Sequence, residues 1–420
     1  MKLSLILLTF FLYFSSFFNT LAAEELHTIH APENKLTPYL EIFEDTSGTM
    51  TIDEVKREKF KSVNLINKKQ SINKGFTDSA IWVKIALKID STKHHWMLEQ
   101  YDWYINELDL YVENIATKGI EKFHTSNLIP FKERLHPNTN LIFPLELHPE
   151  NEYLLYLRYK SKQPLEIRLA LWENDAFSSY IETNNMVWGI FYGGLGIIII
   201  YTSLLLFSIR EATYFYYICY VLSVMLTLSH IHGDLYRYIF PNNPEITFFI
   251  GRLHTPIFVF SALQFSRSFL RTDLFSKPIN NALIGFQLVT VVTLFSSIFL
   301  SFGHYQIIIF TFVGISYLML ISVGLYLLKK GHKEAKYYLI AWSPPAFFVF
   351  LAATRFVYTF PIDINFRIFV PIGFLMEMCL FSFALAHRIN LLQQENKEQL
   401  KSIIDGIPVP VLINRLSDGA

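Results

Sequence analysis

The chain has 420 residues, of which 52% are hydrophobic and 17% are charged, and its basic and acidic side chains balance at a formal net charge of zero. A soluble domain usually carries about 25% charged residues, so the apolar excess predicts membrane-spanning segments. The neutral balance gives no basic surface for nucleic acid. The two cysteines, Cys219 and Cys379, lie in apolar runs and exclude a disulfide framework or a cysteine zinc site.

The first residues predict export from the cytoplasm. Met1 and Lys2 are followed by a long apolar run that ends in the small residues Ala22 and Ala23, which is typical of a signal peptide over residues 1–23. An uncleaved anchor helix is the alternative, because the run is long for a signal peptide. In both cases the following segment lies outside the cytoplasm.

Residues 24–180 have the composition of a globular domain and contain short alternating runs. Every odd position of residues 81–89 is a branched aliphatic residue, which is the period of a half-buried strand. Similar alternation occurs in residues 108–112, 155–159 and 165–171. Several such strands without a helix of comparable strength predict an all-β sandwich, and the preceding export signal places it outside the cytoplasm.

Seven apolar stretches follow, each near the ~20 residues that cross about 30 Å of hydrocarbon. Their expected bounds are 186–208, 212–232, 246–269, 281–302, 305–328, 337–360 and 366–388. The fold class is therefore a β-sandwich domain followed by an all-α seven-helix transmembrane domain over residues 181–390. Pro256, Pro344, Pro345 and Pro371 lie inside these stretches and are expected to kink the helices.

The basic residues of the connectors give an independent orientation, since lysine and arginine collect on the cytoplasmic side. With residues 24–180 outside, the expected inner connectors carry Arg210, Arg267, Arg271, Lys277, Lys329, Lys330, Lys333, Lys336 and Arg388. The expected outer connectors carry only Arg237 and Arg367. The bias favours an odd number of spans and a cytoplasmic C-terminus. A six-span arrangement with one stretch on the membrane surface would break this pattern.

The tail continues the last span as a polar helix. Residues 391–405 form a weak heptad pattern that predicts a signalling helix able to carry rotation or translation out of the membrane. Residues 406–420 then contain an apolar stretch that is typical of the first strand of another domain.

Several stretches carry a family resemblance. They are residues 40–45, 75–83, 107–112, 130–134 and 143–145 in the β region, and residues 331–339 and 383–389 in the membrane half. In this order they resemble the bacterial seven-transmembrane receptors with diverse intracellular signalling modules. Residues 404–419 also look like the opening of a PAS domain that is cut short.

The resemblance implies a receptor in the bacterial inner membrane. Its periplasmic jelly-roll domain would be similar to carbohydrate-binding modules and would sense a small molecule or glycan. Seven helices in the lipid bilayer would relay the signal to a cytoplasmic output module, which this sequence does not contain. A homo-oligomer or a separate cytoplasmic signalling protein is a further expected partner, and a non-catalytic subunit of such a protein is the alternative. A transporter is a weaker alternative, because the helices show no internal repeat.

No pattern of catalytic residues is present, so we expect no enzyme activity and no cofactor. Residues 45–54 resemble a calcium loop, but Met50 occupies the position that requires glycine. His94 and His95 lie in a polar turn and are expected to be solvated rather than metal ligands. A retinal protein would need a lysine in the middle of the last span, and residues 366–388 contain none.

Four aromatic residues gather before the strand at residue 108: Trp96, Tyr101, Trp103 and Tyr104. They predict a stacking platform for a sugar, because pyranose faces pack on aromatic rings, with Glu99, Asp102 and Asn106 as acceptors for hydroxyl groups. The alternative is that alternate members fill the core of the sandwich, as large aromatic side chains usually do.

Glu377 is the most unusual polar residue of the membrane half, since it lies near the middle of the last span. A carboxylate there costs about 2.5 to 3.5 kcal/mol on insertion scales, so a partner is expected. Arg252 and His254 in the third span are the candidate partners, with Gln264 deeper. Glu377 is then either a neutral hydrogen-bonded group that supports the structure or a switch between two packings of the helices.

Overall fold

The computed structural model describes residues 26–62, 71–149, 151–354 and 366–405. Contacts divide the chain into two compact units. The first contains residues 1–186 together with residues 229–251 and 300–306, which are two connectors between helices and the adjoining helix residues. The second contains residues 187–228, 252–299 and 307–420. The predicted signal peptide and the apolar stretch after residue 405 lie outside the described residues.

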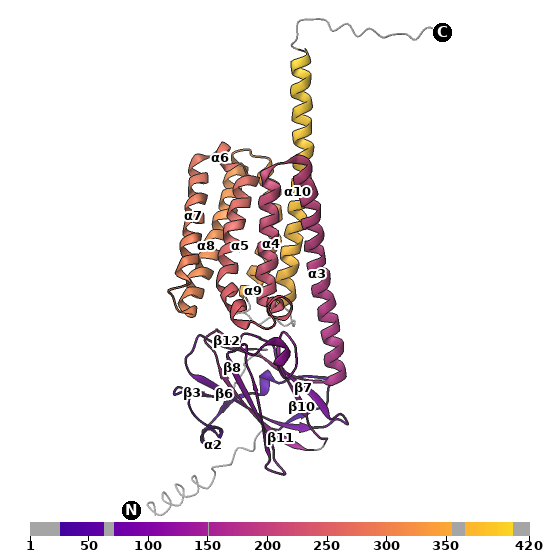
Figure 1. The fold of residues 1–420 in the computed structure, drawn as a ribbon, viewed down its shortest axis with the longest axis vertical. Helices are drawn as coiled ribbons and strands as arrows, with labels where there is room; N and C mark the ends of the chain where they lie inside the picture. The colour runs from indigo at the N-terminus through magenta and orange to yellow at the C-terminus, as the bar shows by residue number, and fades with distance from the viewer. Residues whose placement is uncertain (1–25, 63–70, 150, 355–365, 406–420) are drawn as a thin grey trace, which may run out of the picture. The chain divides into compact units, whose positions relative to one another are not determined.

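The first unit contains two main sheets and one short one (Figure 1). The seven-stranded sheet has the order β4 (Lys61–Ser62), β3 (Glu41–Asp45), β6 (Ala80–Ile89), β11 (Glu152–Lys160), β8 (Glu107–Asn114) and β9 (Ile120–Thr125), with β1 (His27–Ile29) parallel to β6. The four-stranded sheet has the order β10 (Leu141–Glu146), β7 (His95–Gln100), β13 (Leu169–Glu173) and β2 (Glu33–Lys35). β5 (Ile72–Gly75) pairs with β12 (Leu165–Ile167). All pairings except that of β1 with β6 are antiparallel.

The strand predicted for residues 81–89 is present as β6, but it is not half-buried, because Trp82 and Ala86 on its other face are also buried. Its odd positions are buried in a hydrophobic core that also contains Trp96 and Leu98 of β7 and Leu171 of β13. The predicted strand over residues 165–171 is divided between β12 and β13, because its two halves pair with different strands. The backbone N–H of Arg168, at the division, donates to Oε1 of Gln100 over 3.3 Å.

Seven long helices form the remainder of the described chain. They are α3 (Asn174–Ile209), α4 (Ala212–His232), α5 (Pro244–Phe269), α7 (Lys277–Ser296), α8 (Phe302–Lys329), α9 (Glu334–Thr354) and α10 (Phe366–Asp405). Six of them contain a candidate membrane span among the described residues, and α9 does not. The predicted sixth span, residues 337–360, includes residues 355–360, which the structure does not describe. The helices of the second unit share one core with a high content of aromatic side chains.

Two helices are longer than the apolar stretches that predicted them. α3 begins at Asn174, directly after β13, whereas the sequence predicted a span from residue 186. The added turns, NDAFSSYIETNN, are largely polar and therefore have no membrane signal. α10 continues without interruption to Asp405, and its yellow end extends beyond the other helices of its unit (Figure 1).

Candidate functional site

The structure separates the four aromatic residues predicted as a sugar platform. Trp96 is fully buried in the core, and its Nε1 donates to the carbonyl oxygen of Lys93 over 3.2 Å. Tyr101 packs on the outer face of the four-stranded sheet, with the guanidinium carbon of Arg168 5.5 Å from its ring centroid. Trp103 is 2% exposed, and Tyr104 lies at its edge. Trp96 therefore fills the core of the domain, as the alternative interpretation expected, whereas Trp103 is buried outside that core.

Trp103 lies against the connector of residues 229–251, which joins α4 to α5 and belongs to the same compact unit. Its ring stacks on Tyr236, with centroids 6.0 Å apart, and contacts His230 and Phe248. Its Nε1 donates to the carbonyl oxygen of Ile231 over 3.3 Å. The β domain thus packs a buried indole ring against residues 229–251, where the ring N–H also satisfies a backbone acceptor.

Gly233 makes this close contact possible. Its φ of +89° lies in the left-handed region that favours glycine, and a Cβ atom there would be 3.2 Å from Cδ1 of Trp103. Any other residue would therefore meet both backbone strain and a collision with the ring. The sequence places the turn at this residue, directly after His232 ends α4.

A second group of contacts holds the same connector. Arg134 is 5% exposed, and its guanidinium carbon lies 4.4 Å from the ring centroid of Tyr236. The hydroxyl of Tyr236 donates to the carbonyl oxygen of Ile129, and the backbone N–H of Phe131 donates to the carbonyl oxygen of Pro241 over 2.8 Å. Tyr236 is therefore held between Trp103 on one side and the loop before β10 on the other.

The start of α3 is attached to the four-stranded sheet. Trp172 of β13 stacks on Tyr180 of α3, with ring centroids 4.8 Å apart. The buried carboxylate of Glu99 accepts hydrogen bonds from Nε1 of Trp172 over 2.9 Å and from Nδ2 of Asn140 over 2.7 Å. These contacts attach the start of α3 to the four-stranded sheet.

One hydrogen bond connects α3 to the connector. Nη1 of Arg237 donates to Oδ1 of Asn185 over 2.8 Å. The β domain therefore contacts both the start of α3 and residues 229–251, and the hydrogen bond between Arg237 and Asn185 joins these two segments. We name the contacts of Trp103 with residues 229–251 the Trp103 contact.

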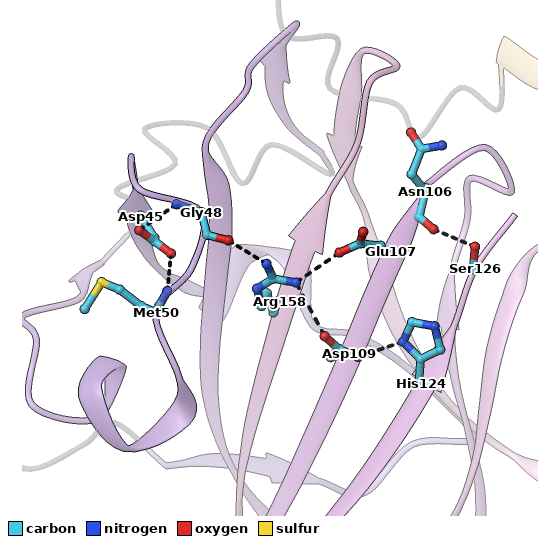
Figure 2. Close-up of polar contacts among 9 residues, drawn as sticks. All are labelled: Asp45, Gly48, Met50, Asn106, Glu107, Asp109, His124, Ser126 and Arg158. Carbon is cyan, nitrogen blue, oxygen red and sulfur yellow. Dashed lines mark hydrogen bonds and ion pairs between the residues drawn. The ribbon is translucent and has the colours of Figure 1, made fainter. Parts of the chain in front are cut away.

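A polar chain crosses the outer face of the seven-stranded sheet (Figure 2). Arg158 of β11 forms ion pairs with Glu107 at 3.3 Å and Asp109 at 3.6 Å, and Asp109 binds Nδ1 of His124 at 2.7 Å. Arg158, Asp109 and His124 lie directly opposite one another on β11, β8 and β9. Because these side chains bind each other, this polar network holds β8, β9 and β11 together.

The loop after β3 is hydrogen-bonded to the same polar network through Arg158 (Figure 2). Nη2 of Arg158 donates to the carbonyl oxygen of Gly48 over 2.8 Å. The buried carboxylate of Asp45 accepts hydrogen bonds from the backbone N–H groups of Ser47, Gly48 and Met50 at 2.9 to 3.0 Å. Burial alone would raise the pKa of Asp45, but these hydrogen bonds outweigh it and the pKa is lowered. Both carboxylate oxygens thus fix the turn.

Glu377 of α10 is fully buried in the second unit. Its Oε1 accepts a hydrogen bond from the hydroxyl of Tyr220 in α4 over 2.9 Å. Its Oε2 has no hydrogen-bond partner among the described residues. The predicted partners make other contacts, since Nη1 of Arg252 donates to the carbonyl oxygen of Ser297 and His254 binds Thr255. The structure therefore pairs Glu377 with a phenol rather than with a cation.

Sequence reasoning missed Tyr220 and Tyr236, the two tyrosines that carry these contacts. Both lie in segments with many aromatic residues, so nothing in the local pattern separates them from ordinary lipid-facing or packing residues. The polar position of Glu377 was visible in the sequence, whereas its partner depends on how the helices pack.

Comparison with protein families gives two matches. Residues 184–388 match the family model described as 7TM diverse intracellular signalling, and residues 37–173 match the model described as 7TMR-DISM extracellular 2. Together the two models cover most of the chain. A comparison with curated proteins gives no match.

Proposed function

The chain belongs to the seven-transmembrane receptors with diverse intracellular signalling modules, and from this premise we propose that it is a bacterial inner-membrane sensor whose Trp103 contact relays ligand binding. It is a multi-pass membrane receptor with an extracellular N-terminal sensory domain. In this proposal the domain lies in the periplasm and binds a small molecule or glycan. The helices pass the change to a cytoplasmic signalling module and catalyse no reaction.

The Trp103 contact is the observation that carries the proposal. A sensory domain linked by a flexible tether could bind a ligand without moving a helix. Here the domain instead buries an indole ring in the connector between two membrane helices and stacks a second indole, Trp172, on the start of a third helix. Packed aromatic contacts of this kind have discrete arrangements, which is what a two-state relay requires.

We further propose that α9 is the seventh span. Its first turns contribute Ala335, Tyr338, Ala341 and Trp342 to the core of the second unit, as a bundle helix would. Glu334 and Lys336 lie in its first turn, and the pair Pro344 and Pro345 lies inside it. An odd number of spans then puts the sensory domain and the end of α10 on opposite sides of the membrane.

A glycan remains the favoured ligand class within this proposal, with Tyr101 and Tyr104 as the predicted ring contacts. The four-stranded sheet carries Tyr101 on its outer face, and Tyr104 follows two residues after Asp102. Neither residue is part of the fully buried core. The jelly-roll topology that the resemblance implies is part of the same proposal.

The test uses the full chain in lipid nanodiscs with spin labels at Lys277→Cys and Lys397→Cys, after replacement of Cys219 and Cys379 by alanine. Soluble oligosaccharides of glucose, xylose and N-acetylglucosamine are added one at a time, and binding is measured by calorimetry. We expect one of them to bind and to change the distance between the labels, and Trp103→Ala to keep the binding but lose the distance change. Binding that leaves the labels of the parent protein unmoved would overturn the proposed relay.

A further inference from the structure

The point at which α10 leaves the helical unit is surrounded by charge. Arg388 of α10 is 2% exposed, although it is the last residue of the candidate span Val370–Arg388. Its Nη2 lies 2.7 Å from Oε1 of Glu211, which precedes α4, and its Nε lies 3.6 Å from Oε1 of Glu334, the first residue of α9. A buried guanidinium therefore contacts two carboxylates from two different connectors. We name these three residues the Arg388 cluster.

The cluster extends to a third connector through His332. Nε2 of His332 lies 3.1 Å from the carbonyl oxygen of Leu270, which follows α5, and 3.9 Å from Oε2 of Glu334. Glu211, after α3, thus contacts Arg388 directly, whereas Leu270, after α5, and His332, after α8, are linked to it through Glu334. Glu334 and Arg388 come from the two membrane-half stretches that carried the family resemblance, and the structure brings those stretches together.

The ion pair of Arg388 with Glu211 is shorter than its ion pair with Glu334. A guanidinium has a planar fork of donors and can bind one carboxylate closely while keeping a second within reach. Removing either partner from a buried charge is costly, so Arg388 must remain paired whenever α10 turns or slides. If Arg388 loses the carboxylate of Glu211 or Glu334, the other of these two is the only partner within ion-pair distance among the described residues.

We propose that Arg388 is a positioning residue that exchanges its close ion pair between Glu211 and Glu334, and that this exchange sets the two positions of the helical stalk, residues 389–405. In the structure Arg388 is in the position paired with Glu211. In the second position Glu334 becomes the close partner, and α10 shifts toward the start of α9. The exchange deepens the proposed relay, because it would convert movement inside the unit into movement of the stalk.

The two positions can be separated without any ligand. The full chain in nanodiscs carries spin labels at Lys277→Cys and Lys397→Cys, in the background without Cys219 and Cys379. Glu334→Gln should favour pairing with Glu211, and Glu211→Gln should favour pairing with Glu334. We therefore expect the mean label distance to move in opposite directions in these two variants, by about 2 Å or more.

Two further variants complete the test. Arg388→Gln should give one broad distribution that spans both positions, and Lys333→Gln, which removes an exposed charge from the same connector, should reproduce the parent distribution. If Arg388→Gln does not fold, the two glutamate variants decide alone. Shifts in the same direction, or no shift in either glutamate variant, would overturn the exchange. Because no ligand is added, this outcome is distinct from failure of the oligosaccharide test.

Discussion

Nε1 of Trp103 donates a hydrogen bond of 3.3 Å to the carbonyl oxygen of Ile231, so a residue between two strands of the sensory domain satisfies the backbone at the end of a membrane helix. The ring is 2% exposed and is enclosed by Tyr236, His230 and Phe248. This relationship gives the sensory domain a packed contact with the connector rather than a tether.

Trp103→Ala should lower the stability of the first unit by about 3–5 kcal/mol, because it removes a large buried ring and leaves a cavity. Trp103→Phe keeps most of the packing but loses the hydrogen bond to Ile231, so we expect a loss of about 1 kcal/mol. Thermal unfolding of the full chain in nanodiscs measures both variants. Equal stability of Trp103→Ala and the parent would mean that the ring is not packed as described.

Arg158→Gln should destabilise the sensory domain by about 1–3 kcal/mol, since it removes the donor to Gly48 and leaves Asp109 and Glu107 without their shared cation. Glu107→Gln is the matched control. The side chain of Glu107 is 50% exposed, so its ion pair should contribute less than about 1 kcal/mol. Denaturant unfolding compares the two variants, and an equal loss in both would contradict this ranking.

The lowered pKa of Asp45 predicts that the sensory domain loses stability in acid. The ordinary pKa of this carboxyl is 3.8, and hydrogen bonds from Ser47, Met50 and Gly48 lower it in the folded chain despite burial. The charged form is therefore stabilised by folding, so the contribution is present above pH 3.8 and is lost as the pH falls through the lower folded value. Asp45→Asn should remove this pH dependence and also lower the melting temperature at pH 7, because the amide nitrogen cannot accept from Met50. A variant that kept the parent's acid sensitivity would argue against Asp45 as its source.

Uncharged substitutions of Glu377 and Tyr220 should have different effects on the stability of the protein. Glu377→Gln keeps an oxygen that can accept from the hydroxyl of Tyr220, so expression and melting temperature should stay near those of the parent. Tyr220→Phe leaves both oxygens of a fully buried carboxyl without a donor and should cost about 1–3 kcal/mol. The reverse order of stability in a nanodisc melting experiment would show that Tyr220 is not the partner that matters.

The sequence predicted most of the architecture because two of its patterns are strong. The alternation in residues 81–89 follows directly from one buried face of a strand, and β6 has that face. The apolar stretches likewise follow from the thickness of the hydrocarbon. The start of α3 was missed because residues 174–185 are helical through their packing on β13, and polar composition carries no sign of that packing.

The candidate site was only partly visible. The aromatic cluster around Trp103 was correctly noticed, but sequence alone cannot distinguish a ring that contacts a ligand from one that contacts residues 229–251. The same limit applies to Glu377, whose pairing with Tyr220 depends on the packing of α4 against α10. Contacts between segments far apart in the sequence leave no local periodicity, and for this reason the partners could not be predicted.

The central claim is that an extracellular sensory domain is connected to a stalk on the other side of the membrane. Single cysteines at Lys35, on the exposed face of β2, and at Lys401, on the exposed part of α10, test it directly in intact cells. A membrane-impermeant maleimide, applied after the outer membrane is opened, should label Lys35→Cys at once and Lys401→Cys only after the inner membrane is broken. Labelling of both positions at the same stage would place them in one compartment and contradict the account.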